Sequence, residues 1–241
     1  MNETIRQLYA RKSVRVYTDK PISEEYKNLI LESAMQAPTA GNQQLYSIID
    51  ITDQQLKDRL AVSCDNQPFI AEAPMVLIFC VDFQKWYDLF ECTGAKPRRP
   101  GVGDLMLAAA DAIIAAQNAV VAAESLGIGS CYIGDILEQK EVHQEMLNLP
   151  QYVMPVCMLV FGYPTEQQKN RPKPERHKLM DIVMENGYAR KDGDSLRKMF
   201  GDKTGQKPLN EWVQAFCKRK YNSDFSVEMT RSVAEYIKLW Q

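Results

Sequence analysis

The sequence predicts an α+β domain with a helical C-terminal extension. Helical patterns alternate with three or four apolar runs of strand length, and these runs are too unevenly spaced for successive βαβ units. The chain has 241 residues, 45% of them hydrophobic and 25% charged, which is enough for a sizeable core. We expect one body formed by residues 1–188 and an extension, residues 189–241, that packs on this body or on a partner subunit.

The first elements are predicted by spacing and by capping residues. Residues 5–10 have a short helical pattern, and Ser23 is a candidate N-cap for a second helix that ends before Pro38. Residues 46–51 are rich in β-forming side chains and predict the first strand.

The middle of the chain predicts the core. A helix is expected over residues 53–62, and the continuous apolar run 73–81 predicts a central strand covered on both faces. Residues 82–103 mix aromatic side chains with prolines and suit an excursion over the surface or over a site. The alanine-rich helix expected over residues 104–126 allows close approach of another helix, within the chain or across a dimer. Polar residues interrupt this apolar helix, so we expect it to be buried in protein and not in a membrane.

The last part of the chain predicts two more strands and the extension. Residues 131–134 predict a short strand and residues 154–163 a strongly apolar one. Residues 165–178 are hydrophilic and basic. Amphipathic helices are expected over residues 209–218 and 226–240, and exposed apolar helix faces of this kind need burial.

Charge and composition exclude several classes of partner. The formal net charge is −2, so no general attraction to nucleic acid or to anionic lipid is expected. The polar segment 1–6 is unlike a signal peptide, and we expect a cytoplasmic protein. Six scattered cysteines and two histidines predict buried free thiols, with neither disulfides nor a metal site.

Two polar segments near the N-terminus predict an anion site. The sequence Arg11-Lys12-Ser13-Val14-Arg15 carries three cations and a hydroxyl, and residues 37–44 form a polar, turn-forming segment with amide side chains. Residues 169–173 offer further basic donors. Taken alone, the first cluster is also typical of a solvated basic turn. Together, the three segments suit a cofactor with a phosphate at one end and a planar polar ring at the other.

Common nucleotide and catalytic motifs are absent from the sequence. No strand leads into a G-x-G-x-x-G turn, and there is no P-loop, nucleophile elbow or H-E-x-x-H pattern. The sequence Gly127-Ile128-Gly129 predicts a helix C-cap, which needs no ligand.

In their order along the chain, the motifs resemble those of the FMN-dependent nitroreductase family. They are Arg11–Tyr17, Lys20–Ile22, Ala37–Gln43, Gln67, Ala73–Pro74, Ala116–Ala119, Leu126–Gly134, Gly162–Pro164 and Arg171–Pro174, and they cover most of residues 5 to 185. The resemblance implies a central mixed, mostly antiparallel sheet flanked by helices. It also implies bound FMN, NADH or NADPH as electron donor, and a homodimer with FMN at the subunit interface.

The resemblance also assigns cofactor-binding roles residue by residue. It places Arg11 toward the FMN phosphate and Arg15 toward the N1/O2 edge of the ring, and it draws one segment, residues 38–42, from the other subunit. The late basic motif has two possible registers, Lys169 with Arg171 or Arg171 with Lys173. The full expected set is Arg11, Lys12, Ser13, Arg15, Pro38, Thr39, Ala40, Asn42, Gln67, Ile133, Gly134, Arg171 and Lys173.

The implied reaction is a ping-pong cycle in which NAD(P)H gives hydride to the flavin and is then replaced by an electron acceptor. Nitroaromatics, quinones and free flavins are the expected small-molecule acceptors, and no catalytic side chain is required. Two alternatives stay open: a specialised flavin enzyme of the same fold, for example a reductive dehalogenase, and a flavin-binding module without useful turnover.

Overall fold

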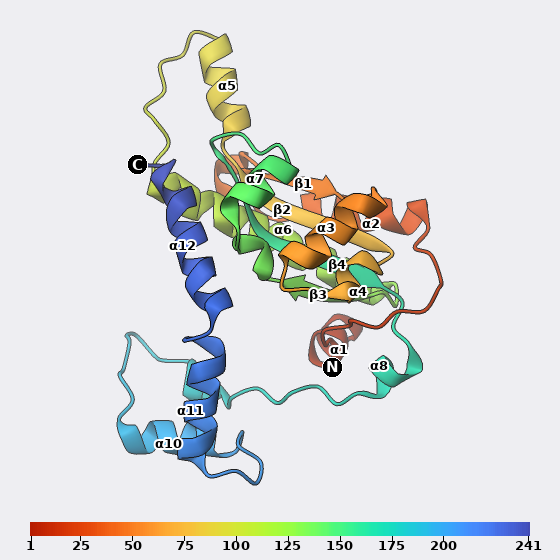
Figure 1. Ribbon diagram of the computed structural model, residues 1–241, viewed down its shortest axis with the longest axis vertical. Coiled ribbons are helices and arrows are strands. Elements are labelled where there is room, and N and C mark those ends of the chain that lie inside the picture. Colours follow the sequence, from red (N-terminus) through yellow and green to blue (C-terminus); the bar gives the residue numbers. More distant parts are fainter. The chain divides into compact units, whose positions relative to one another are not determined.

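The computed structural model describes residues 1–241 and contains one antiparallel sheet (Figure 1). Its four strands have the order β1-β2-β4-β3. They are β1 (Tyr46–Asp50), β2 (Met75–Asp82), β3 (Gly129–Ile133) and β4 (Val153–Gly162). The four predicted strand regions are confirmed, and with them the α+β class. One isolated parallel bridge, between Ser13 and Ser130, joins the N-terminal segment to β3.

The two central strands are buried on both faces, as their unbroken apolar sequences predict. Every residue of β2 is buried, and in β4 only Val156 is partly exposed. Side chains alternate between the two faces of a strand, so Leu77 and Phe79 of β2 join one apolar cluster while Val76 and Ile78 join another.

Helices α2 (Glu24–Met35) and α6 (Val102–Ser125) cover one face of the sheet. Buried alanines of α6 allow the close packing that the sequence predicts; they are Ala108, Ala112, Ala115, Ala116, Ala119 and Ala123. By length and composition α6 could span a bilayer, but its buried side chains form part of the protein core. On the other face lie α3 (Gln54–Ser63) and α4 (Pro68–Ala71).

The remaining elements of this part of the chain are short. They are α1 (Glu3–Ala10), α5 (Gln84–Cys92), α7 (Lys140–Met146) and α8 (Glu166–Asn170), with single 3₁₀ turns at Ala40–Asn42 and Asp135–Leu137. Helix α5 forms within residues 82–103, which were expected to be an irregular segment. The aromatic side chains there obscured the helical pattern of the sequence.

The chain divides into two compact units. The first contains Met1–Arg171 and Glu228–Gln241, and the second contains Pro172–Val227. The boundary expected at residue 188 lies inside the second unit. Its helices are α9 (Leu179–Ile182), α10 (Gly193–Gly201) and α11 (Leu209–Lys220); α12 (Asp224–Lys238) begins there and returns to the first unit. There Tyr236 and Trp240 are fully buried.

The cysteines are free, and their burial varies. Four are buried: Cys64, Cys80, Cys131 and Cys157. Burial raises the pKa of the Cys64 and Cys157 thiols to about 12, which keeps them protonated and unreactive. The prediction of burial is wrong for Cys92 and Cys217, because they lie on the exposed faces of α5 and α11.

Candidate cofactor site

The first basic segment, residues 11–15, is extended and lies beside the ends of β3 and β4. Val14 N donates to Ser130 O at 3.0 Å, and Thr18 N donates to Tyr163 O at 2.9 Å. Because Val14 points into the core, the side chains on either side of it in the extended segment face outward. This geometry presents the basic side chains of residues 11–15 at one edge of the sheet.

Two glycines allow the N-terminal extended segment to pack closely against β3 and β4. A Cβ atom at Gly129 would lie 2.4 Å from Cγ2 of Val14, and one at Gly162 would lie 2.4 Å from Cδ1 of Tyr17. Gly127 has a different role, because its φ of 73° and its bond to Glu124 O end helix α6. The predicted C-cap is confirmed for Gly127, whereas the role of Gly129 in packing was not foreseen.

Lys12 and Arg171 tie the first basic segment to the late one. The Lys12 ammonium donates to the carbonyl oxygens of Lys169 and Arg171, each at 2.5 Å. In return, Arg171 Nη2 donates to Ser13 O at 2.6 Å. These residues were expected to face a phosphate, and the structure brings them together. The Lys12 ammonium therefore also holds the backbone of the late basic segment, residues 169–171.

Arg11 lies over an aromatic ring and keeps unused donors. Its guanidinium carbon is 5.8 Å from the centre of the Tyr132 ring, in cation–π contact. Its Nε and Nη2 atoms are buried and have no hydrogen-bond partner. The hydroxyl oxygen of Ser130, on the adjoining strand, is also buried without a partner. Buried donors of this kind are costly when unpaired, which is typical of a site that a ligand completes.

Arg15 and Gln67 meet at α4. The guanidinium of Arg15 lies 5.6 Å from the centre of the Phe69 ring, and Gln67 is the N-cap residue of the same short helix. Gln67 Nε2 donates to Asp135 Oδ2 at 3.0 Å, and Asp135 directly follows Gly134 at the end of β3. The expected residues Arg15, Gln67, Ile133 and Gly134 therefore lie on connected elements.

The segment 38–42 is anchored at another place. Asp111 of α6 is buried, and its two oxygens accept hydrogen bonds from Ala40 N at 3.0 Å and Leu45 N at 3.3 Å. Arg11, in contrast, lines a small hollow with Val120 of the same helix. These two positions of α6 are roughly nine residues apart, or about 14 Å at 1.5 Å per residue. Within one chain, no hydrogen bond joins the segment 38–42 to the first basic segment.

A hollow of about 280 Å³ lies between the two basic segments. Lys12, Gly129, Gln168 and Lys169 are among the residues that line it. The Lys169 ammonium pairs with Glu166 Oε1 at 2.6 Å on the surface of α8. Of the two registers expected for the late motif, Arg171 is common to both, and its side chain contacts the first segment.

Sequence reasoning missed the polar segment that follows β3. Glu138 is buried, and burial together with the nearby Asp135 and Asp65 carboxylates raises its pKa to about 7. His143 is fully buried, with Nε2 2.8 Å from Ser63 Oγ. Burial lowers the pKa of His143 and favours its neutral form. No local sequence pattern signals this cluster, because its partners are distant along the chain.

The comparison with known families decides the assignment. The model of the Nitroreductase family matches residues 8–163, which include the first basic segment, all four strands and Gly134. The chain belongs to the nitroreductase family.

Several characterised relatives match most of the chain. FMN reductase [NAD(P)H] of Bacillus subtilis is 34% identical over 177 residues, which is 72% of this chain and 70% of the relative. Oxygen-insensitive NADPH nitroreductase of Salmonella typhimurium is 33% identical over 199 residues, 82% of this chain and 80% of the relative. Among solved structures, NADPH:FMN oxidoreductase of Vibrio harveyi, complexed with NAD⁺, superposes with a TM-score of 0.84 at 25% identity, covering 98% of each chain.

Proposed function

We propose that this protein is an FMN-dependent NAD(P)H oxidoreductase of the nitroreductase type, which reduces nitroaromatics, quinones or flavins. The observation that carries the proposal is the basic corner built by Lys12, Ser13 and Arg171, with the unused donors of Arg11 beside it. Relatives named as FMN reductase and NADPH nitroreductase support the same conclusion.

The residues present fit FMN by the chemistry of their free atoms. Arg11 and Ser130 hold buried donors that lack a protein partner, as an anionic or hydroxyl-rich ligand requires. At Gly134 no heavy atom lies within 4 Å of the position that a Cβ would take, which leaves room for a ligand to approach the backbone. The residues of the first unit that would hold the cofactor are Arg11, Lys12, Ser13, Arg15, Gln67, Ile133, Gly134 and Arg171.

When bound, FMN supplies the transfer of two electrons between NAD(P)H and the acceptor. Arg15 holds a positive charge near α4 without an ion-pair partner: its backbone N donates to Gln168 Oε1, and its guanidinium lies over the face of Phe69. A cation in this position stabilises negative charge that develops on a ring beside it. The chain then contributes binding, orientation and electrostatics, and no side chain is needed as a general acid.

The proposed active form is a homodimer with FMN at the subunit interface. Helix α6 exposes an apolar face at Met106, Leu107, Ile113 and Ile114, which are between 39% and 65% exposed. Such a face on a helix that otherwise lies in the core is typical of a subunit interface. The anchoring of segment 38–42 to Asp111, away from Arg11, supports its arrival at the partner's site, with Pro38, Thr39, Ala40 and Asn42 completing that site.

A cytoplasmic location completes the proposal, because NAD(P)H is supplied there, and α6 is accounted for by the protein core. The test is anaerobic reduction of the purified, FMN-reconstituted protein. The yellow flavin should bleach with NADH or NADPH and recover its colour with a nitroaromatic or a quinone. A colourless protein that cannot be reconstituted would refute the proposal, and flavin that binds but is not reduced would favour a binding module.

A further inference from the structure

The Gln67 carboxamide has one fixed orientation. Its Nε2 atom donates to Cys64 O at 2.8 Å and to Asp135 Oδ2 at 3.0 Å. A backbone carbonyl only accepts, so the amide nitrogen, and not the amide oxygen, must face Cys64. Both amide hydrogens are therefore used within the protein. The Oε1 atom is left without a hydrogen bond, and it is not among the buried unpaired atoms, so a ligand can reach it.

Asp135 is held in place by its own neighbours. It begins the 3₁₀ turn Asp135–Leu137 that directly follows Gly134. The buried Glu138 carboxyl lies close to the Asp135 carboxyl, and this neighbour adds to the effect of burial in raising the pKa of Glu138. Two adjacent carboxyl groups are stable together when one of them keeps a proton, and burial favours a proton on Glu138. A neutral Glu138 leaves Asp135 Oδ2 to accept from Gln67 Nε2 at 3.0 Å.

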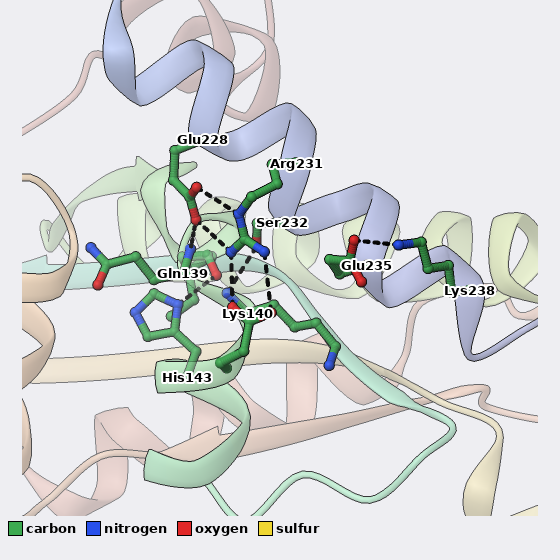
Figure 2. Close-up of polar contacts among 10 residues, drawn as sticks. Gln139, Lys140, His143, Glu228, Arg231, Ser232, Glu235 and Lys238 are labelled. Carbon is green, nitrogen blue, oxygen red and sulfur yellow. Dashed lines mark hydrogen bonds and ion pairs between the residues drawn. The ribbon is translucent and has the colours of Figure 1, made fainter.

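The far end of the same segment is bound to α3 and to α12. Gln139 Nε2 donates to Ser63 O at 2.9 Å, and Gln139 N donates to Glu228 Oε1 at 3.0 Å. Lys140 N donates to Ser232 Oγ at 2.9 Å. Figure 2 shows Glu228 and Ser232 of α12 beside the start of α7. Anchors on both sides restrict the movement of Asp135 relative to Gln67.

We propose that Asp135 is a positioning residue that fixes the Gln67 carboxamide with its oxygen toward the flavin, so that Gln67 accepts a hydrogen bond and donates none. The flavin groups that can donate are the ring N3–H and the ribityl hydroxyls. The inference rests on the proposed function, because it requires FMN beside Gln67. The inference also gives the direction of the hydrogen bond: Gln67 recognises a hydrogen-bond donor of the flavin and not the carbonyl oxygens of the ring.

Titration of the apoprotein with FMN and four analogues tests the inference through binding and not through turnover. The analogues are 3-methyl-FMN and the 2′-, 3′- and 4′-deoxy forms of FMN, compared by quenching of flavin fluorescence. Wild-type protein should bind one of the analogues about 10-fold more weakly than FMN, the loss expected for one buried hydrogen bond. The affected analogue identifies the donor, ring N3–H or one ribityl hydroxyl. Gln67→Ala should remove this discrimination.

The role of Asp135 is tested in the same assay. Asp135→Ala should reduce the discrimination several-fold, and Asp135→Asn, which keeps an acceptor oxygen for Nε2, should restore it. In a Gln67→Ala background Asp135→Ala should change nothing, because the two effects are coupled. Asp135→Ser replaces the alanine variant if the latter does not fold. The control is Asp58→Ala, since Asp58 accepts from the Gln54 amide at 2.9 Å on the exposed face of α3.

The outcomes separate the inference from the function it rests on. Equal affinity of wild-type protein for FMN and for every analogue would overturn the acceptor role of Gln67 while leaving FMN binding intact. Undiminished discrimination in Asp135→Ala would overturn the positioning role. No binding of FMN by the wild-type apoprotein would instead refute the proposed function.

Discussion

Arg231 of α12 and Glu141 of α7 form an ion pair with two parallel hydrogen bonds. Nη1 lies 3.1 Å from Oε1 and Nη2 lies 2.8 Å from Oε2, and the same guanidinium also contacts Glu228 (Figure 2). The pair lowers the pKa of Glu141 to about 2. It joins residues 90 positions apart and attaches the last helix to the segment after β3.

Loss of this pair should loosen α12. We expect Arg231→Ala to lower the midpoint of urea unfolding. The effect should shrink as pH falls below 4.5, where Glu141 is protonated in the unfolded state, and be lost as pH passes 2, where it is protonated in the folded state too. Lys238→Ala is the control, because Lys238 pairs with Glu235 within α12 alone. Equal midpoints for the two variants would show that the bidentate pair does not hold the helix.

Glu138 should make the protein less stable as pH rises. Its pKa is raised from the ordinary 4.5 to about 7 by burial and by Asp135, Asp65 and Glu228, so its contribution is full below pH 4.5 and is lost as pH passes 7. The free energy of unfolding of Glu138→Gln, relative to wild type, should rise by roughly 1–3 kcal/mol from pH 5 to pH 8. Taking this difference at each pH cancels the titration of His143.

The exposed Glu145 of α7 provides the matched control for this experiment. Glu145→Gln should follow the pH dependence of the wild-type protein. If the stability of Glu138→Gln also follows the pH dependence of the wild-type protein, Glu138 does not hold its proton at neutral pH. A protonated Glu138 would then no longer explain how Asp135 is held as the acceptor for Gln67.

Gly129 should not tolerate a side chain. Gly129→Ala places a Cβ atom 2.4 Å from Val14, so the first basic segment must move away from β3. We expect a loss of about 1–3 kcal/mol in unfolding free energy and weaker FMN binding. Val14→Ala should partly rescue both properties by removing the clash. Gly103→Ala, with no heavy atom within 4 Å, should keep wild-type FMN affinity and equal or higher stability.

The fold was predictable where local sequence decides the structure. An unbroken apolar run is enough to predict β2, and alanine spacing is enough to predict α6, because burial on both sides leaves a clear composition. The hydrogen bonds of Lys12 were not predictable, since its ammonium bonds to carbonyls 157 and 159 positions away. The contacts of the segment around Glu138 were not predictable for the same reason. Gln139, which adjoins Glu138, donates to Glu228, and these two residues are 89 positions apart. Residue type gave the charges of the site, but only the fold decides which partners they meet.

The proposed site shared between two subunits makes a prediction that mixed dimers can test. Asp111→Ala removes the acceptor of Ala40 N and Leu45 N and should release the segment 38–45, and Arg15→Ala removes a cation from the opposite side of the site. Each homodimer should bind FMN at least about 10-fold more weakly than wild type, since bonds to charged groups are worth about 1.5–3 kcal/mol.

Co-expression of the two variant chains then shows whether each FMN site is built from one subunit or from two. If the segment 38–42 of each chain completes the site of its partner, a mixed dimer contains one site with both wild-type parts and one site with neither. Random pairing should restore about a quarter of the sites to wild-type affinity, measured by FMN titration of the mixture. If both parts belong to the same chain, every site keeps one defect and no tight-binding fraction appears. That result would place the flavin within a single subunit.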